Sequence, residues 1–363
     1  MLAITSFAAL SLSAVCSAAD LGGARSTDPT RAARLQEALN TWAADSTHYG
    51  VSASIILADG TQWSGTAGRG GAGLRLGHLI GIASITKTMT GAVILQLADE
   101  GRLTLDDPIR RWLPPRPNID SGITIRQLLN HTNGLANYNA NPALASAVAT
   151  DSARRFSTDE LLQFVGPALF SPGTRTQYTN TSFILLGAIA ERVTGKPIVE
   201  LYRKRLWNPL KLCEIFLPGS GAAPTPVAPA LANGVVVSPL GRLSHFSAGH
   251  TAYGLMASAR AVARWGHALF TGRVVSAQMR QEMRRLVPAA GNIPGESGAG
   301  LAIRSYNYLG RTQFGHSGGS PLGSSLLLHD PTSGVTVAVL MNQGQRADHF
   351  VLAPRLLEIA TQP

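Results

Sequence analysis

The sequence predicts an α+β fold, because strand-like patterns occupy both ends of the chain and helical patterns fill its middle. Apolar residues make up 45% of the 363 residues, which is enough to bury a large core. The turn sequence at 330–334 joins the last two strands directly and favours antiparallel pairing. No internal repeat is visible that would indicate a solenoid or a propeller.

The N-terminal part of the predicted domain begins with a helix and a hairpin. Residues 28–44 carry apolar side chains at helical spacing, so we expect an amphipathic helix there. Two short strands are expected at 51–57 and 61–66. The Asp59-Gly60 pair between them is a typical hairpin turn sequence.

The middle of the chain is predicted to be helical, and Pro, Gly and Asn residues separate the segments. The longest helical pattern covers 84–99 and stops before Gly101. A Pro/Ala/Gly-rich stretch at 218–234 is expected to form a lid or a surface loop. The other helical segments are 124–131, 158–165, 181–194, 198–207, 258–270 and 276–286.

Strand patterns return after Gly298 and end in a final helix. The alternation of apolar and polar residues changes from a helical period to a strand period at this point. The strands are expected at 301–306, 312–314, 323–329 and 335–341, and the closing helix at 350–360.

The composition excludes several classes of protein. The apolar content argues against a disordered chain, and the charged fraction of only 14% argues against a coiled coil. Two cysteines are too few for a disulfide-rich scaffold or a Cys-based zinc finger. No apolar run reaches the about 18 residues that a membrane-spanning helix needs, so we expect no integral membrane segment.

The chain is basic, with 31 Lys and Arg against 21 Asp and Glu and a formal net charge of +10. The basic residues are scattered in short clusters, of which Arg203-Lys204-Arg205 is the densest. A nucleic-acid-binding surface would concentrate such charge on one face and interleave aromatic side chains. We therefore expect no nucleic-acid partner.

The first 19 residues have a composition of their own. They carry no charged side chain, and Ser17-Ala18-Ala19 is a small-residue cleavage sequence before Asp20. We interpret residues 1–19 as a secretory signal peptide, which implies a secreted or periplasmic protein of residues 20–363. The usual basic residues before the apolar stretch are absent, so a buried N-terminal helix stays open as the alternative.

Ser84 and Lys87 form an S-x-x-K motif at the start of a predicted helix. Positions i and i+3 share a helix face, so the amine can reach the hydroxyl. A partly buried lysine near the free N–H groups of a helix start has its pKa lowered, and its neutral amine can act as a base. On its own the motif is weak, since Ser84 could be a helix cap and Lys87 a solvated side chain.

Two further motifs strengthen this interpretation. Tyr178-Thr179-Asn180 precedes a predicted helix, and His316-Ser317-Gly318-Gly319 lies on a predicted strand. Together the three motifs resemble, in order and chemistry, those of the penicillin-recognising serine hydrolases: class C β-lactamases, D,D-carboxypeptidases and related esterases. The resemblance covers roughly residues 28–361 and is densest in the segments 84–109, 124–135, 178–198 and 314–334.

The resemblance implies the serine β-lactamase/penicillin-binding-protein fold. In that fold an antiparallel sheet, flanked by N- and C-terminal helices, packs against an all-helical lobe, with the site between them. The sheet lobe would comprise residues 20–80 and 298–363, and the helical lobe residues 81–297.

The resemblance also implies roles for individual residues. Ser84 would be the acylated nucleophile, Lys87 would take its proton, and Tyr178 would relay a proton to the leaving group. Asn180 would orient Lys87 and the substrate amide. The backbone N–H groups of Ser84 and Gly319 would form the oxyanion hole.

Other residues near these motifs carry weaker expectations. His316 and Ser317 would line the pocket that meets a substrate carboxylate. His131 is expected to be a structural histidine, and Asn137 and Tyr138 are candidates for the wall of the site. The histidines show no metal-ligand spacing, so we expect neither a metal nor a cofactor.

One competing motif is Gly315-His316-Ser317-Gly318-Gly319, which matches the G-x-S-x-G nucleophile elbow and would make Ser317 the nucleophile. That fold needs a helix after the motif and a parallel β/α alternation. Here a predicted strand follows the motif, so we favour Ser84.

The activity is less well defined by the sequence. His316 stands where many relatives have a permanently charged Lys, which puts strong β-lactamase activity in doubt. We expect a D-alanyl-D-alanine carboxypeptidase-like or β-lactamase-related hydrolase that acts as a monomer on a small molecule or a cell-wall peptide. A carboxylesterase on the same site, or a non-catalytic peptidoglycan- or penicillin-binding module, stays open as an alternative.

Overall fold

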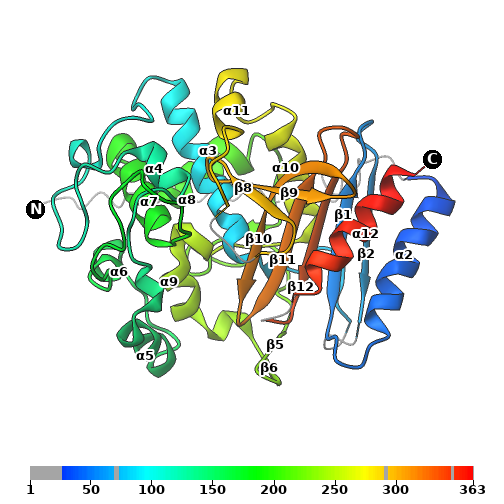
Figure 1. Cartoon of the computed structure of the whole chain (residues 1–363). Coiled ribbons are helices and arrows are strands. Elements are labelled where there is room, and N and C mark those ends of the chain that lie inside the picture. Colours follow the sequence, from blue (N-terminus) through cyan, green and yellow to red (C-terminus); the bar gives the residue numbers. More distant parts are fainter. Residues whose placement is uncertain (1–26, 69–72, 290–292, 345–346, 363) are drawn as a thin grey trace, which may run out of the picture.

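The centre of the fold is a seven-stranded antiparallel sheet (Figure 1). The structure is a computed structural model, and it describes residues 27–68, 73–289, 293–344 and 347–362. The strands of the sheet run in the order β2-β1-β12-β11-β10-β9-β8. Terminal segments of the sequence therefore meet in the sheet, where β1 pairs with β12. The strands are β1 (Val51–Ile56), β2 (Gln62–Ala67), β8 (Glu296–Ala299), β9 (Arg304–Tyr308), β10 (Arg311–Ser320), β11 (Gly323–His329) and β12 (Thr336–Met341).

Helices cover both faces of this sheet. The two terminal helices, α2 (Pro29–Ala43) and α12 (His349–Thr361), pack side by side on one face (Figure 1). Asp28 caps α2 by accepting a hydrogen bond from the Arg31 N–H, and a proline at the first helical position fixes its start. The other face is covered by α10 (Ala259–Phe270), a segment that the sequence analysis assigned to the helical lobe.

The helical lobe is built around α3 (Thr86–Asp99). This helix is buried on almost every side, and its first two turns bury the polar side chains of Thr86, Lys87, Thr88 and Thr90 as well as apolar ones. It contacts α7, α8 and α9. The lobe consists of α3, α4 (Ile125–Leu129), α5 (Pro142–Thr150), α6 (Thr158–Leu162), α7 (Thr181–Thr194), α8 (Ile198–Tyr202), α9 (Leu243–Tyr253) and α11 (Ala277–Met283).

Short strands complete the structure near the site. β3 (Ile80–Gly81), β7 (Met256–Ala257) and β4 (Ile215–Phe216) form a small sheet just before the Ser84 segment. The stretch 218–234, expected to be a lid or a surface loop, is instead partly buried. It carries β5 (Ala230–Ala232), which pairs with β6 (Val235–Val237), and the Leu231 N–H donates to the carbonyl of Asn342.

Among the described residues, the sequence did not predict the helices α5 and α9, the edge strand β8 or the short strands β3 to β7. The predicted signal peptide, residues 1–19, lies outside the described residues. Within the described ranges no helix combines the length and the apolar character that crossing a bilayer requires.

Candidate active site

Ser84 lies in a short 3-10 turn, Ala83–Ile85, that leads directly into α3. The residue before it, Ala83, has φ +46°, a left-handed conformation that costs energy for a residue with a Cβ. Ser84 itself is partly exposed and faces a cavity, while its neighbours on both sides are buried. The backbone thus turns the hydroxyl out of an otherwise buried segment.

Lys87 lies one helical turn after Ser84 and is completely buried. Its Nζ is 3.2 Å from Ser84 Oγ, 2.5 Å from Asn180 Oδ1 and 2.8 Å from the carbonyl oxygen of Ala252. Burial, and then the positive charge of Arg304, lower the pKa of this amine well below its usual value. A neutral amine has two N–H donors and one lone pair. With Asn180 and Ala252 accepting the two hydrogens, the lone pair is left for the Ser84 hydroxyl.

Tyr178 approaches Ser84 from the other side. Its phenol donates a hydrogen bond to Ser84 Oγ at 2.8 Å. The buried ring of His131 lies against the Tyr178 ring, with centroids 4.5 Å apart, and His131 Nδ1 accepts from the Thr179 N–H at 3.3 Å. His131 therefore positions the tyrosine, as expected of a structural histidine. Burial raises the pKa of the Tyr178 phenol, and the charge of Arg304 acts in the opposite direction.

Asn180 is held by two asparagines from the loop before α5. Its backbone N–H donates to Asn137 Oδ1 and its Nδ2 donates to Asn139 Oδ1, each at 3.1 Å. Asn139 lines the cavity at Ser84, whereas Asn137 does not. Tyr138, the other candidate for the wall, is fully buried in the core. The sequence analysis thus missed Asn139, which lies next to both candidates.

The HSGG motif forms the last part of β10, beside the Ser84 turn. A Cβ at Gly318 would collide with the Ile82 carbonyl oxygen and approach Ala83 Cβ to 3.0 Å, so only glycine allows this close packing. Ser325 on the next strand fixes the contact by donating to the Ile82 carbonyl at 2.9 Å. Gly319 is exposed and lines the cavity together with Ser84, which suits the two expected oxyanion donors.

His316 and Ser317, like Lys87 and Tyr178, are not among the described residues that line the cavity at Ser84. Successive residues of a strand point to opposite faces. His316 pairs with Leu327 and lies toward Tyr178, and Ser317 pairs with Leu326, which packs in the core under the terminal helices. His316 is only 2% exposed and its Nδ1 bonds to the Ser317 carbonyl at 2.6 Å. Burial, reinforced by Arg304, lowers its pKa well below the usual value, so its ring is neutral.

Arg304, on β9, is a second residue near Ser84 that sequence reasoning missed. The guanidinium is buried and its Cζ lies 4.5 Å from the centroid of the Tyr178 ring, in cation–π geometry. It forms a buried ion pair with Glu296 of β8. β9 pairs with β10 only as far as Gly315 opposite Arg304, so the arginine sits where the free edge of β10 begins. No motif marks this position, because the proximity comes from the strand register.

The cavity in front of Ser84 has a volume of about 320 Å³. One wall is apolar and comes from α5, another comes from α9, and a third comes from the end of β10 and Pro321. Burial lowers the pKa of its only histidine, His245, to about 4. The described residues that line it are therefore all neutral: Ser84, Asn139, Leu144, Ala145, Val148, Asn180, His245, Tyr253, Gly319, Ser320 and Pro321.

The hydroxyl of Ser84 faces this cavity, and the amine of Lys87 and the phenol of Tyr178 lie within hydrogen-bonding distance of it. Among the described residues, no cluster of three or more His, Cys, Asp or Glu side chains is arranged to hold a metal ion. A hydroxyl between a neutral amine and a phenol, next to two backbone N–H groups, can attack a carbonyl carbon and stabilise the oxyanion that forms.

Comparisons with curated proteins agree with this chemistry. The chain is 35% identical over 150 residues to the esterase EstB of Burkholderia gladioli, a match that covers 38% of each chain. It is 26% identical over 215 residues to the D-alanyl-D-alanine-carboxypeptidase/endopeptidase AmpH of Escherichia coli strain K12, which covers 55% of each chain. The matches thus span about half or less of these two curated relatives.

A solved structure and a family model match over much longer ranges. A D-stereospecific amidohydrolase from Streptomyces is 31% identical, with a TM-score of 0.78, and the match covers 89% of this chain and 98% of the other. Residues 35–361 match the family model described as Beta-lactamase. This chain therefore belongs to the beta-lactamase family, a family of serine hydrolases with the serine β-lactamase/penicillin-binding-protein fold.

Proposed function

We propose that this protein hydrolyses small neutral amides or esters of D-amino acids through an acyl-enzyme on Ser84. The observation that carries the proposal is the neutral lining of the Ser84 cavity among the described residues. An uncharged cavity wall favours an uncharged substrate, because nothing there compensates for the desolvation of a carboxylate. The preference for D-amino acid derivatives is supported by the similarity to the D-stereospecific amidohydrolase over almost its full length.

Acylation starts with the neutral amine of Lys87. The lone pair of Nζ faces Ser84 Oγ at 3.2 Å and takes the hydroxyl proton as Oγ bonds to the substrate carbonyl carbon. The carbonyl oxygen becomes an oxyanion, which the N–H groups of Ser84 and Gly319 stabilise. Lys87 becomes an ammonium ion that Asn180 Oδ1 and the Ala252 carbonyl already solvate, so little reorganisation is needed.

Tyr178 then protonates the leaving group. Its phenol lies 2.8 Å from Ser84 Oγ, which places the proton beside the nitrogen or oxygen that leaves the tetrahedral carbon. The carbon–heteroatom bond breaks, the amine or alcohol departs, and the Lys87 ammonium returns its proton to the tyrosine. In deacylation, Tyr178 and Lys87 take a proton from water as the water oxygen attacks the acyl carbon, and Ser84 recovers its hydrogen.

The burial and neutrality of His316 support this proposal over a carboxypeptidase. The sequence analysis gave His316 the task of meeting a substrate carboxylate. A buried, neutral imidazole offers no charge to a carboxylate and is poorly suited to that task. We therefore rank the amidase or esterase above the D-alanyl-D-alanine carboxypeptidase, which the similarity to AmpH keeps as the second candidate.

A matched set of substrates tests the proposal. N-acetyl-D-alanine amide, N-acetyl-D-alanine p-nitroanilide and an N-acetyl-D-alanine ester, none of which carries a charge, are compared with their L-enantiomers and with an acyl-D-alanyl-D-alanine peptide. We expect kcat/KM to be at least about tenfold higher for the neutral D-substrates than for the carboxylate-bearing peptide. A higher kcat/KM for the peptide would instead support the carboxypeptidase, and Ser84→Ala should abolish whichever activity is found.

A further inference from the structure

A second cavity lies on the side of α9 away from Ser84. Its volume is about 250 Å³, below the ~300 Å³ at which drug-sized pockets begin, so its ligand would be small. It is enclosed by the end of α7, the start of α8, residues of α9, and two loop segments, 155–156 and 217–220. It shares no lining residue with the cavity at Ser84. We call it the Glu191–Arg155 cavity.

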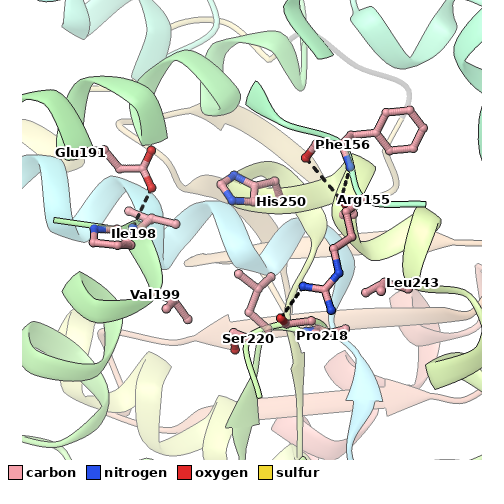
Figure 2. A pocket seen from close by; sticks show the side chains of 13 residues that line it. Arg155, Phe156, Glu191, Ile198, Val199, Pro218, Ser220, Leu243 and His250 are labelled. Carbon is pink, nitrogen blue, oxygen red and sulfur yellow. Dashed lines mark hydrogen bonds between the residues drawn. The ribbon is translucent and has the colours of Figure 1, made fainter. Parts of the chain in front are cut away.

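Two opposite charges line this cavity without pairing with each other. Glu191 Oε1 accepts a hydrogen bond from the Ile198 N–H at 2.8 Å, and burial raises the pKa of this carboxyl. Arg155 donates to the carbonyl oxygen of Gly219 at 2.9 Å. No ion pair is recorded for either side chain within the described residues. Figure 2 shows them on opposite sides of the cavity, with the ring of His250 between them.

His250 supports the interpretation of this cavity as a binding site. Its backbone has φ +33° and ψ −119°, an energetically unfavourable conformation that interrupts α9. Its Nδ1 atom is buried and has no hydrogen-bond partner among the residues that the structure describes, and the same holds for Ser220 Oγ on the facing loop. Strained backbone and unpaired buried polar atoms are costly, and they concentrate at functional sites.

The remaining lining defines the middle of the ligand. Between the charged ends, the wall consists mainly of Phe156, Ile198, Val199, Leu217, Pro218 and Leu243. A complementary molecule therefore carries an ammonium group and a carboxylate for the two charged sides of the cavity, and an apolar portion that contacts the wall between them. Free amino acids with apolar side chains and their dipeptides share this chemistry.

We propose that the Glu191–Arg155 cavity is a second, non-catalytic binding site for a short zwitterion, an apolar amino acid or dipeptide. The ammonium group binds the Glu191 carboxylate and the carboxylate binds the Arg155 guanidinium. The two unpaired polar atoms, His250 Nδ1 and Ser220 Oγ, face the ligand between these ends. The proposal does not depend on the reaction carried out at Ser84.

Isothermal titration calorimetry on the full chain tests the site, with Ser84 first acylated by a slowly hydrolysed inhibitor so that the catalytic cavity is blocked. The probes are D-leucine, L-leucine and D-alanyl-D-alanine, together with N-acetyl-leucine, which lacks the ammonium group, and leucine amide, which lacks the carboxylate. We expect at least one zwitterion to bind about tenfold or more tightly than both blocked derivatives, the scale of one lost charged contact. Comparing the dissociation constants of the amino acid and the dipeptide shows which ligand length binds more tightly.

Substitutions locate the binding. Glu191→Gln keeps the acceptor for the Ile198 N–H, and Arg155→Gln removes an exposed charge, so both variants should fold. Each should weaken zwitterion binding by about tenfold or more, while Arg192→Gln, an exposed control on the same helix, should leave it unchanged. Any of three results would overturn the proposal. These are equal binding of the zwitterions and the blocked derivatives, no zwitterion binding to the acylated enzyme, and unchanged affinity in both cavity variants.

Discussion

Replacing Arg304 by methionine should move the whole pH–rate profile of kcat/KM to higher pH. Lys87 must be neutral to act as the base, so its pKa sets the acidic limb of the profile, and Tyr178 must be protonated, so its pKa sets the alkaline limb. The positive charge of Arg304 lowers the pKa of both groups. Removing this charge therefore raises both pKa values, and both limbs shift in the same direction.

The size of the shift follows from the distance between Arg304 and Tyr178. Taking the ring centroid for the phenol, unit charges 4.5 Å apart interact by about 3.7 kcal/mol at an effective dielectric constant near 20. This corresponds to an upper limit of about 2.7 pH units. Glu296 contacts the guanidinium and cancels part of its field, so we expect a shift of about one unit.

Glu296→Gln supplies the opposite perturbation. It leaves the charge of Arg304 without its counter-ion, so both limbs of the profile should move to lower pH. Arg304→Lys retains the positive charge and should keep the profile close to that of the parent. The assay is kcat/KM for a neutral ester between about pH 5 and 11, with melting temperatures measured in parallel. Breaking the buried pair should cost about 3–5 kcal/mol of stability in Arg304→Met. Shifts of the same sign in Arg304→Met and Glu296→Gln, or none in either, would refute this electrostatic role.

Three further predictions concern the groups around Ser84. Lys87→Met and Tyr178→Phe should each lower kcat by about 10²- to 10⁴-fold with the fold retained, and the double variant should lose far less than the product of the two, as measured by steady-state kinetics and circular dichroism. Additive losses would mean that the two groups act independently. Gly318→Ala should lower both the melting temperature and the activity because its Cβ meets the Ile82 carbonyl, while Gly319→Ala has open space and should melt like the parent. A normal melting temperature in the first variant would contradict the close packing. Because the pKa of His316 is held well below its usual value, KM for an acyl-D-alanyl-D-alanine peptide should change little between about pH 5.5 and 8, and a tenfold rise would show that the imidazole binds the carboxylate after all.

The sequence predicted the parts of the fold whose local patterns are strong. The helices α3 and α7 carry the S-x-x-K and Y-x-N motifs at their starts, and both were expected with boundaries close to those observed. α9 was missed because Gly249 and the non-helical conformation of His250 interrupt it. The edge strand β8 was missed because it is short and contains a glycine and a bulge.

The residues of the candidate site also include some that motif spacing predicts and one whose position depends on the tertiary structure. Ser84, Lys87, Tyr178 and Asn180 were predicted from motif spacing, and the structure brings all four within hydrogen-bonding distance of a neighbour in the set. The position of Arg304 could not be predicted, since it depends on where β9 stops pairing with β10.

His316 and Ser317 show a second limit of motif reasoning. The motif places both residues beside the site, but the alternation of the strand sends their side chains to opposite faces, and packing buries His316. Secretion, the monomeric state and the absence of a cofactor remain predictions, since none of them follows from the described fold.

The central claim, that Ser84 is acylated, is tested most directly by intact-protein and peptide mass spectrometry after incubation with a fluorescent penicillin and, separately, with an activated D-amino acid ester. The account predicts one added acyl group on the peptide that contains Ser84, retained in Ser317→Ala and lost in Ser84→Ala. An adduct on the peptide that contains Ser317, or hydrolysis of the ester that persists undiminished in Ser84→Ala, would contradict it.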